Sequence, residues 1–196
     1  ESSILISDLQ GRISELNLIT GNAKKIRALT LLKSPEEFFS HQGVKSIEII
    51  ENYLYLSLAV GEKACPRIEV YRIGISELRD SPPTLVWRMP GCFTQKNIDG
   101  TYADLNLNAA GARLIKSPIK NKILLSIGTP EIWKGSEEVE PSPFSGKIVQ
   151  IDLKSHDYQI ISSGHRNPQG MCWAKNQLFE NEQGPMGGDE INLIKK

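Results

Sequence analysis

Short runs in which apolar and polar residues alternate are the feature that most constrains the fold of this chain. Successive side chains of a β-strand point to opposite faces, so such alternation over a few residues indicates a strand with one buried face. Turn signals such as Gln10-Gly11 and Thr20-Gly21-Asn22 separate the runs. The runs lie at residues 3–8, 13–19, 25–32, 46–50, 53–58, 67–75, 84–89, 112–116, 122–127, 146–152 and 158–161. This pattern predicts an all-β fold.

The predicted strands fall into groups. Residues 46–89 hold four of them within about 45 residues, which is the size of one propeller blade. A similar group covers residues 112–161, and another begins at Gly170. We therefore predict a single domain over residues 1–196 that is a partial β-propeller of about three blades plus the start of a fourth. The approximate blades are residues 1–40, 41–95, 103–162 and, incompletely, 163–196.

Two segments depart from the strand pattern. Residues 33–39 read as one short helical turn. Residues 129–145 are rich in proline and acidic residues, which predicts a long surface loop within a blade.

Charge and hydropathy exclude several kinds of partner. Lys plus Arg number 23 and Asp plus Glu also number 23, so the formal net charge is zero. No basic patch favours nucleic acid, and no apolar run is long enough to span a bilayer. We expect neither a nucleic-acid nor a membrane partner. The chain begins at Glu1 and shows no signal peptide, which leaves its compartment open.

The three cysteines are Cys65, Cys92 and Cys172. No Cys or His residues are paired at metal-ligand spacing, so a cysteine metal site is disfavoured. A Cys65–Cys92 disulfide is one possibility that the sequence leaves open. Met171 and Cys172 follow one another on a predicted strand, and we expect both in the core.

Two polar loops joined by one hairpin stand out near the end of the chain. In the first, Asn167 precedes a proline, which favours an extended backbone and predicts that Arg166 and Asn167 are displayed at a loop tip. The second, residues 184–188, is glycine-rich and exposes backbone oxygens. The hairpin would place the two loops side by side. Together they would offer a guanidinium, amides, carbonyls and a carboxylate to an anionic or quinone-like ligand and a hard cation.

These loops carry two long motifs: Gly164-His165-Arg166-Asn167-Pro168-Gln169-Gly170, and Glu182-Gln183-Gly184-Pro185 followed by Gly188-Asp189-Glu190-Ile191-Asn192-Leu193-Ile194. They closely resemble the glucose/sorbosone dehydrogenase family, which includes soluble quinoprotein glucose dehydrogenases and aldose sugar dehydrogenases. The family fold is a six-bladed β-propeller, and this chain resembles its N-terminal half. The resemblance implies a fragment of a longer protein. The alternatives are a ring closed by a second copy, through self-association of open sheet edges, or edges capped in another way.

The resemblance implies pyrroloquinoline quinone (PQQ) and Ca²⁺ as cofactors. By position in the motifs, the residues implied to hold the quinone are Arg166, Asn167, Gln169 and Gln183, with Asp189 holding Arg166 in place. The backbone oxygens of Gly184 and Pro185 are implied to bind calcium. A fixed guanidinium and a Lewis-acidic cation suit a quinone that gains negative charge as it accepts hydride. The non-functional alternative is that Arg166 and Asp189 form a structural ion pair between two loops.

The chain departs from the family at the general base. Family members carry a His in the window that here reads Asn108 or Ala109, depending on one gap. They also end the next strand with Gly-Asp, the Asp orienting that His, where this chain has Gly128-Thr129. Glu131 lies nearby without an assignable role. The catalytic residues are therefore unknown, and cationic residues that clamp the cofactor in the family fall beyond Lys196.

The histidines offer no replacement base. His165 belongs to the first motif, where family members do not use it as the base, and we expect it to fix the loop by hydrogen bonds. His41 and His156 lie in polar surroundings and are expected at the surface.

The leading hypothesis is a PQQ-dependent aldose dehydrogenase-like protein that transfers hydride from a sugar hydroxyl to the quinone and is impaired or inactive in this chain. The alternative is a non-catalytic β-propeller used as a binding or scaffold module. A degraded reading frame is a third possibility. The resemblance implies a small sugar as partner and a periplasmic or secreted location.

Overall fold

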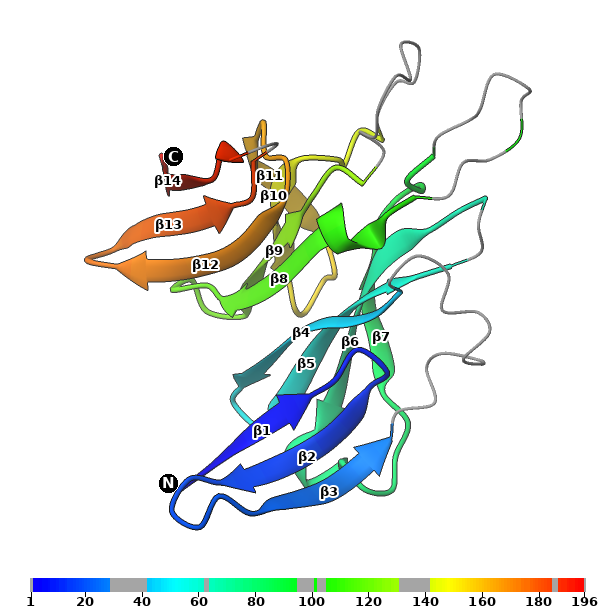
Figure 1. Ribbon diagram of the computed structural model, residues 1–196, viewed down its shortest axis with the longest axis vertical. Helices are drawn as coiled ribbons and strands as arrows, with labels where there is room; N and C mark the ends of the chain where they lie inside the picture. Colours follow the sequence, from blue (N-terminus) through cyan, green and yellow to red (C-terminus); the bar gives the residue numbers. More distant parts are fainter. Residues whose placement is uncertain are drawn as a thin grey trace.

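The computed structural model describes residues 2–28, 42–61, 64–94, 101, 105–130, 142–184 and 187–195. The described residues form antiparallel β-sheets and short 3-10 turns, with no α-helix among them (Figure 1). The predicted turn at 33–39, His41 and most of the loop at 129–145 lie outside the described residues. The all-β prediction is confirmed. None of the helical segments described is long and apolar enough to cross a membrane.

The strands form four sheets in chain order. The first contains β1 (Ser3–Ser7), β2 (Arg12–Asn17) and β3 (Ala23–Ala28). The second contains β4 (Gly43–Ile50), β5 (Tyr53–Val60), β6 (Arg67–Gly74) and β7 (Thr84–Arg88). The third contains β8 (Gly111–Lys116), β9 (Lys122–Ile127), β10 (Lys147–Asp152) and β11 (Tyr158–Ser163). The fourth contains β12 (Pro168–Ala174), β13 (Gln177–Glu182) and β14 (Glu190–Ile194). The 3-10 turns η3 (Ile75–Glu77) and η4 (Leu107–Ala110) precede β7 and β8.

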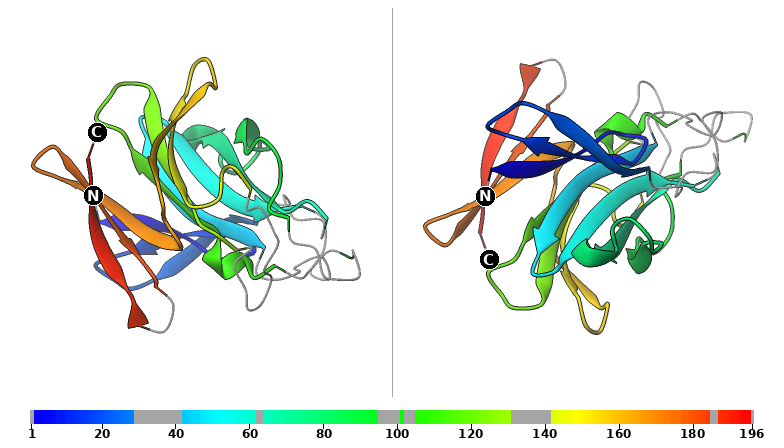
Figure 2. Two further views of the ribbon diagram at one scale, coloured as in Figure 1. Left: turned by 90° about the horizontal axis from the view of Figure 1, so that it is seen from above. Right: turned by 90° about the horizontal axis from the view of Figure 1, so that it is seen from below.

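The sheets follow one another through their first strands. β1 contacts β4, β4 contacts β8, and β8 contacts β12 (Figures 1 and 2). Within each sheet the later strands are added outward in order. This serial arrangement of antiparallel sheets is that of propeller blades. The division of the chain into blades at the boundaries given above stays a prediction.

Strand β5 shows how the sequence builds the core between sheets. Leu54, Leu56 and Leu58 alternate onto one face and pack with Ile13 of the first sheet. Tyr55 lies on the opposite face, within the core shared with the third sheet. Both faces of β5 are therefore buried, which is why its sequence is a continuous apolar run rather than a simple alternation.

The cysteines divide as follows. Cys65 and Cys92 form a disulfide with their Cα atoms 4.8 Å apart, the possibility that the sequence left open. Met171 is buried as expected. The prediction for Cys172 is wrong, since it is a free, exposed cysteine. Neighbouring residues of a strand point to opposite faces, so burial of Met171 turns Cys172 to the solvent.

Candidate functional site

The first motif forms the connection between β11 and β12. Arg166 is partly buried, and Asn167 is 3% exposed. The expectation that both residues are displayed at a loop tip is therefore wrong for Asn167. Its side chain is buried because neighbouring amides satisfy it: Gln169 Nε2 donates to Asn167 Oδ1 at 2.5 Å, and Asn167 Nδ2 donates to Gln183 Oε1 at 3.2 Å.

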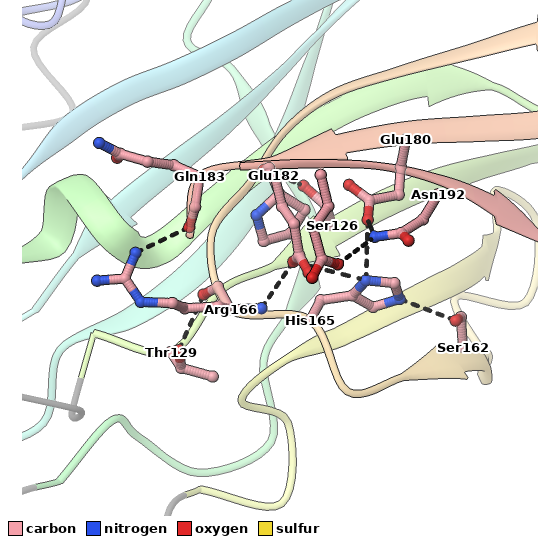
Figure 3. A network of polar contacts seen from close by, with 11 residues as sticks. Ser126, Thr129, Ser162, His165, Arg166, Glu180, Glu182, Gln183 and Asn192 are labelled. Carbon is pink, nitrogen blue, oxygen red and sulfur yellow. Dashed lines mark hydrogen bonds and ion pairs between the residues drawn. The ribbon is translucent and has the colours of Figure 1, made fainter. Parts of the chain in front are cut away.

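The two loops lie side by side, as the single hairpin predicts. Strand β12 pairs antiparallel with β13, with Pro168 opposite Glu182, so the residues flanking this pair meet. The Gln183 amide N–H donates to Asn167 O at 3.1 Å. Arg166 Nη1 donates to Gln183 O at 2.8 Å (Figure 3). The structure thus brings together four of the predicted quinone-holding residues: Arg166, Asn167, Gln169 and Gln183.

Asp189 does not hold Arg166. Its Oδ1 accepts a hydrogen bond from the Gly184 amide at 3.0 Å, and no ion pair joins it to Arg166 within the described residues. The expected Arg166–Asp189 contact is wrong because the Asp189 carboxylate accepts the Gly184 amide N–H instead. A Cβ at Gly184 would lie 1.8 Å from Gly188 O, so this tight loop requires glycine there. Pro185, the second implied calcium ligand, lies outside the described residues.

Two segments that flank strands of the third sheet complete the arrangement: η4, before β8, and Thr129, after β9. Gln169 Nε2 also donates to Asn108 O of η4 at 3.2 Å. The Thr129 amide and Thr129 Oγ1 both donate to Arg166 O, at 2.8 Å and 2.9 Å. The positions at which the family carries its His and Asp therefore lie beside the first motif. The residues present, Asn108, Ala109 and Thr129, carry no titratable side chain.

An open cavity of about 460 Å³ adjoins the motifs. Its lining comes from Gln169, Asn181, Glu182, Gln183, Asp189, Glu190 and Ile191. Asp189 and Glu190 contribute carboxylates to this lining, and the Arg166 guanidinium and the end of the Gln183 side chain lie on one side of the loop in Figure 3. The surroundings therefore offer oxygen ligands for a cation and, separately, donors for an anion.

A buried cluster of His165, Glu180 and Glu182 lies beside Arg166 (Figure 3). His165 Nδ1 is 3.2 Å from Glu180 Oε1 and 3.8 Å from Glu182 Oε2. His165 Nε2 is 2.8 Å from Ser162 Oγ, which confirms the expected loop-fixing role. Burial raises the pKa of Glu182, and the neighbouring Glu180 raises it further, against a hydrogen bond from the Arg166 amide that lowers it.

Sequence reasoning missed the two glutamates of this cluster. The signal was available in β13, where Leu178, Glu180 and Glu182 share one face, and all three are buried. An acidic residue that shares the buried face of a strand with a leucine is itself expected to be buried, and a buried carboxylate needs a partner.

The donor set fits the implied cofactors. Gln183 Nε2 donates no hydrogen bond within the described part of the chain, although its Oε1 is occupied by Asn167. With Arg166 it leaves donors for the oxygens of an anionic quinone. The Gly184 carbonyl and the Asp189 and Glu190 carboxylates are hard oxygen groups of the kind that bind Ca²⁺.

Comparison with known proteins agrees with this geometry. The family model for glucose / sorbosone dehydrogenase matches residues 110–196. A quinoprotein glucose dehydrogenase B of Acinetobacter calcoaceticus is 54% identical over 68 aligned positions, which cover 27% of this chain and 14% of that protein. An aldose sugar dehydrogenase of Escherichia coli is 56% identical over 41 positions, covering 19% of this chain and 11% of that protein.

The fold extends beyond the sequence match. A PQQ-bound aldose sugar dehydrogenase structure from Streptomyces coelicolor superposes with a TM-score of 0.69 at 19% identity. The superposition covers 98% of this chain and 57% of that one, so the chain spans little more than half of the relative's length. This likeness confirms the partial β-propeller. The resemblance to the glucose/sorbosone dehydrogenase family is therefore confirmed, with the sequence match in residues 110–196 and the fold shared over nearly the whole chain.

Proposed function

We propose that this chain carries the cofactor-holding half of a PQQ-dependent aldose dehydrogenase-like site and lacks the group that accepts the substrate proton. The observation that carries the proposal is the convergence of Arg166, Asn167, Gln169 and Gln183 beside Asn108 and Thr129. The first four residues keep the groups that would hold the quinone. The last two stand where the family carries its general-base His and the Asp that orients it. Cofactor binding and turnover are therefore expected to be separable in this chain.

The binding residues are held rigidly before any ligand arrives. Arg166 is fixed at both ends, since its carbonyl accepts two hydrogen bonds from Thr129 and its guanidinium donates to Gln183 O. The remaining guanidinium N–H groups face outward with the Gln183 amide (Figure 3). Preorganised donors of this kind hold an anion without the cost of ordering flexible side chains. When bound, PQQ would supply a hydride-accepting quinone and Ca²⁺ a Lewis acid.

The calcium would be held by the second loop. The Gly184 carbonyl is one ligand, and we propose that of Pro185 as the other. Asp189 keeps this loop closed through the Gly184 amide, so its part is to position the carbonyl. The Asp189 and Glu190 carboxylates near the cavity add a negative field that favours a cation.

The step that this chain lacks a residue for is removal of the substrate proton. Oxidation of a sugar hydroxyl releases a hydride from carbon and a proton from oxygen, and the proton needs an acceptor within hydrogen-bond reach. Neither the amide of Asn108 nor the methyl of Ala109 accepts a proton at neutral pH. The Thr129 hydroxyl is committed to Arg166 O. We therefore infer that sugar oxidation is slow even when the cofactor is bound.

The first test is a calorimetric titration with PQQ in the presence of Ca²⁺. Arg166→Ala removes a charged donor to the anion, and we expect the affinity for PQQ to fall roughly 10- to 100-fold. Arg79→Ala removes an exposed guanidinium that lies before β7, and it should leave the affinity unchanged. Absence of PQQ binding by the wild-type chain, or equal affinity in Arg166→Ala, would overturn the proposal.

The second test restores the base. Asn108→His places an imidazole at an exposed position whose carbonyl already contacts Gln169, and we expect PQQ-dependent dye reduction with aldoses to rise about 100-fold. Ala109→His tests the other register that the one gap leaves open, at a partly buried position. Strong dye reduction by the wild-type chain would contradict the claim that the base is lost. An Asn108→His variant that binds PQQ but shows no increase in dye reduction would also contradict it.

A sugar substrate and a periplasmic or secreted location are part of the same proposal. The Cys65–Cys92 disulfide supports this location, because disulfides persist in oxidising compartments. Self-association through open sheet edges stays a prediction, which sedimentation of the purified chain would test.

A further inference from the structure

Beside the proposed cofactor loop lies a group of buried ionisable side chains that this function does not use. His165, Glu180 and Glu182 are 6%, 2% and 8% exposed. One ligand-type atom from each lies within 4.8 Å of the others. Two carboxylates are thus held away from water. Within this group of three side chains, only the His165 imidazole can carry a positive charge. The Arg166 guanidinium does not compensate them, since it is bonded to Gln183 O.

Glu180 provides an independent sign that a ligand is required. Its Oε1 accepts hydrogen bonds from Asn192 Nδ2 at 2.9 Å and lies 3.2 Å from His165 Nδ1. Its Oε2 is buried and has no hydrogen-bond partner within the described residues. A buried carboxylate oxygen without a donor is costly, and a bound cation would remove that cost.

The surroundings orient His165 as a metal ligand. Its Nε2 lies 2.8 Å from Ser162 Oγ, so with an ion bound the Nε2–H tautomer would donate to that hydroxyl and leave the Nδ1 lone pair for the metal. Metal-binding histidines are commonly fixed in this way through the ring nitrogen that does not bind the metal. In Figure 3 the ring stands between Ser162 on one side and the glutamates on the other.

The distances suit a small transition-metal ion. Tetrahedral ligation at about 2.0–2.2 Å places ligand atoms roughly 3.4 Å apart. His165 Nδ1 is already 3.2 Å from Glu180 Oε1 and 3.8 Å from Glu182 Oε2. One imidazole and two carboxylates are a ligand set for zinc-class ions, whereas Ca²⁺ takes six to eight oxygens.

We propose that His165, Glu180 and Glu182 bind one divalent transition-metal ion of the zinc class as a structural site under the Arg166 loop. The ion would join the β11–β12 connection to β13. Glu182 Oε2 also accepts the Arg166 amide N–H at 2.7 Å, so the same ion would hold the backbone of Arg166 in place. The site is distinct from the calcium position at Gly184 and does not depend on the quinone.

The test is a titration of the chelator-treated chain with Zn²⁺ alone, without PQQ or Ca²⁺. We expect one high-affinity ion per chain and a rise in Tm of roughly 5 °C or more at a free Zn²⁺ concentration a hundred times Kd. Co²⁺ in place of Zn²⁺ should give visible absorption bands typical of low-coordinate nitrogen and oxygen ligation. Added Ca²⁺ should not displace either ion.

Variants identify the ligands. Glu180→Gln keeps the shape of the side chain and removes its charge, and we expect Zn²⁺ affinity to fall on the order of 100-fold, at least as much as loss of a supporting residue costs. His156→Asn removes an exposed histidine elsewhere and should leave the Zn²⁺ affinity unchanged. Zn²⁺ binding that survives Glu180→Gln, or no binding by the folded wild-type chain, would overturn the proposal.

A milder variant covers the case in which Glu180→Gln fails to fold. Ser162→Ala removes only the hydroxyl that supports His165 Nε2, at a partly buried position. We expect the Zn²⁺ affinity to fall about 10-fold while circular dichroism stays that of the wild type. An unchanged affinity in the folded Ser162→Ala chain would count against ligation by His165 Nδ1.

Discussion

Gly128→Ala will lower the free energy of unfolding by about 3 kcal/mol, a large effect for a single methyl group. A Cβ at Gly128 would lie 1.9 Å from Ala109 O and 2.9 Å from Ala109 C. Both are backbone atoms, so no side-chain rotation relieves the overlap. The turn η4 or the end of β9 must move, and the hydrogen bond from the Gly128 amide to Ala110 O, 2.9 Å long, is strained with it.

The measurement is urea unfolding followed by circular dichroism, with Gly170→Ala as the matched control. Neither glycine has a positive φ. A Cβ at Gly170 would approach Asn181 Oδ1 at 2.1 Å, but this is the end of an exposed side chain that can rotate. We expect Gly170→Ala to change stability by less than about 1 kcal/mol. Equal effects of the two variants would show that the approach of Gly128 to Ala109 is not the constraint that we describe.

Loss of the Cys65–Cys92 disulfide will cost about 3.5 kcal/mol at 25 °C. The bridge joins cysteines 27 positions apart and encloses β6 and β7. In the chain-entropy model, cross-linking a loop of roughly this length raises the free energy of the unfolded state by about 3.5 kcal/mol, because it lowers the conformational entropy of that state. The double variant Cys65→Ser/Cys92→Ser should therefore unfold at a clearly lower urea concentration than the wild type.

Reductant provides the internal check on this second prediction. Dithiothreitol should move the wild-type unfolding midpoint to that of the double variant and should leave the double variant unaffected. Cys172→Ser replaces the free, exposed cysteine and should shift stability by less than about 0.5 kcal/mol. A wild-type midpoint that does not respond to reductant would contradict a stabilising bridge.

The strands were predictable because the signal for them is local. Alternation over a few residues selects the extended backbone and its buried face together, so runs such as 122–127 coincide with β9. The meeting of Arg166 and Gln183 was predictable for a related reason. One hairpin separates them, and antiparallel pairing of β12 with β13 leaves their flanking residues adjacent. The cofactor itself was recognised only through the resemblance of the two motifs to a family.

The contacts that the sequence did not predict depend on how the side chains of a loop are oriented in the folded chain. Asn167 precedes a proline, which indicates an extended backbone but not the burial of its side chain. Asp189 follows a glycine-rich turn, and only the closed turn shows that it binds the Gly184 amide rather than Arg166. The partner of Cys65 was likewise open, because pairing depends on the distance between two Cα atoms and not on spacing along the chain.

By itself the sequence determined the all-β class, the strand positions and the hairpin that brings the two motifs together, because each depends on residues close in the chain. Tertiary structure decided the rest of the site. Asn108 precedes β8 and Thr129 follows β9, and they reach Gln169 and Arg166 because the third sheet packs beside β12. The buried group around His165 likewise forms only when the loop after β11 folds against β13, since long-range packing chooses which polar side chains lose contact with water.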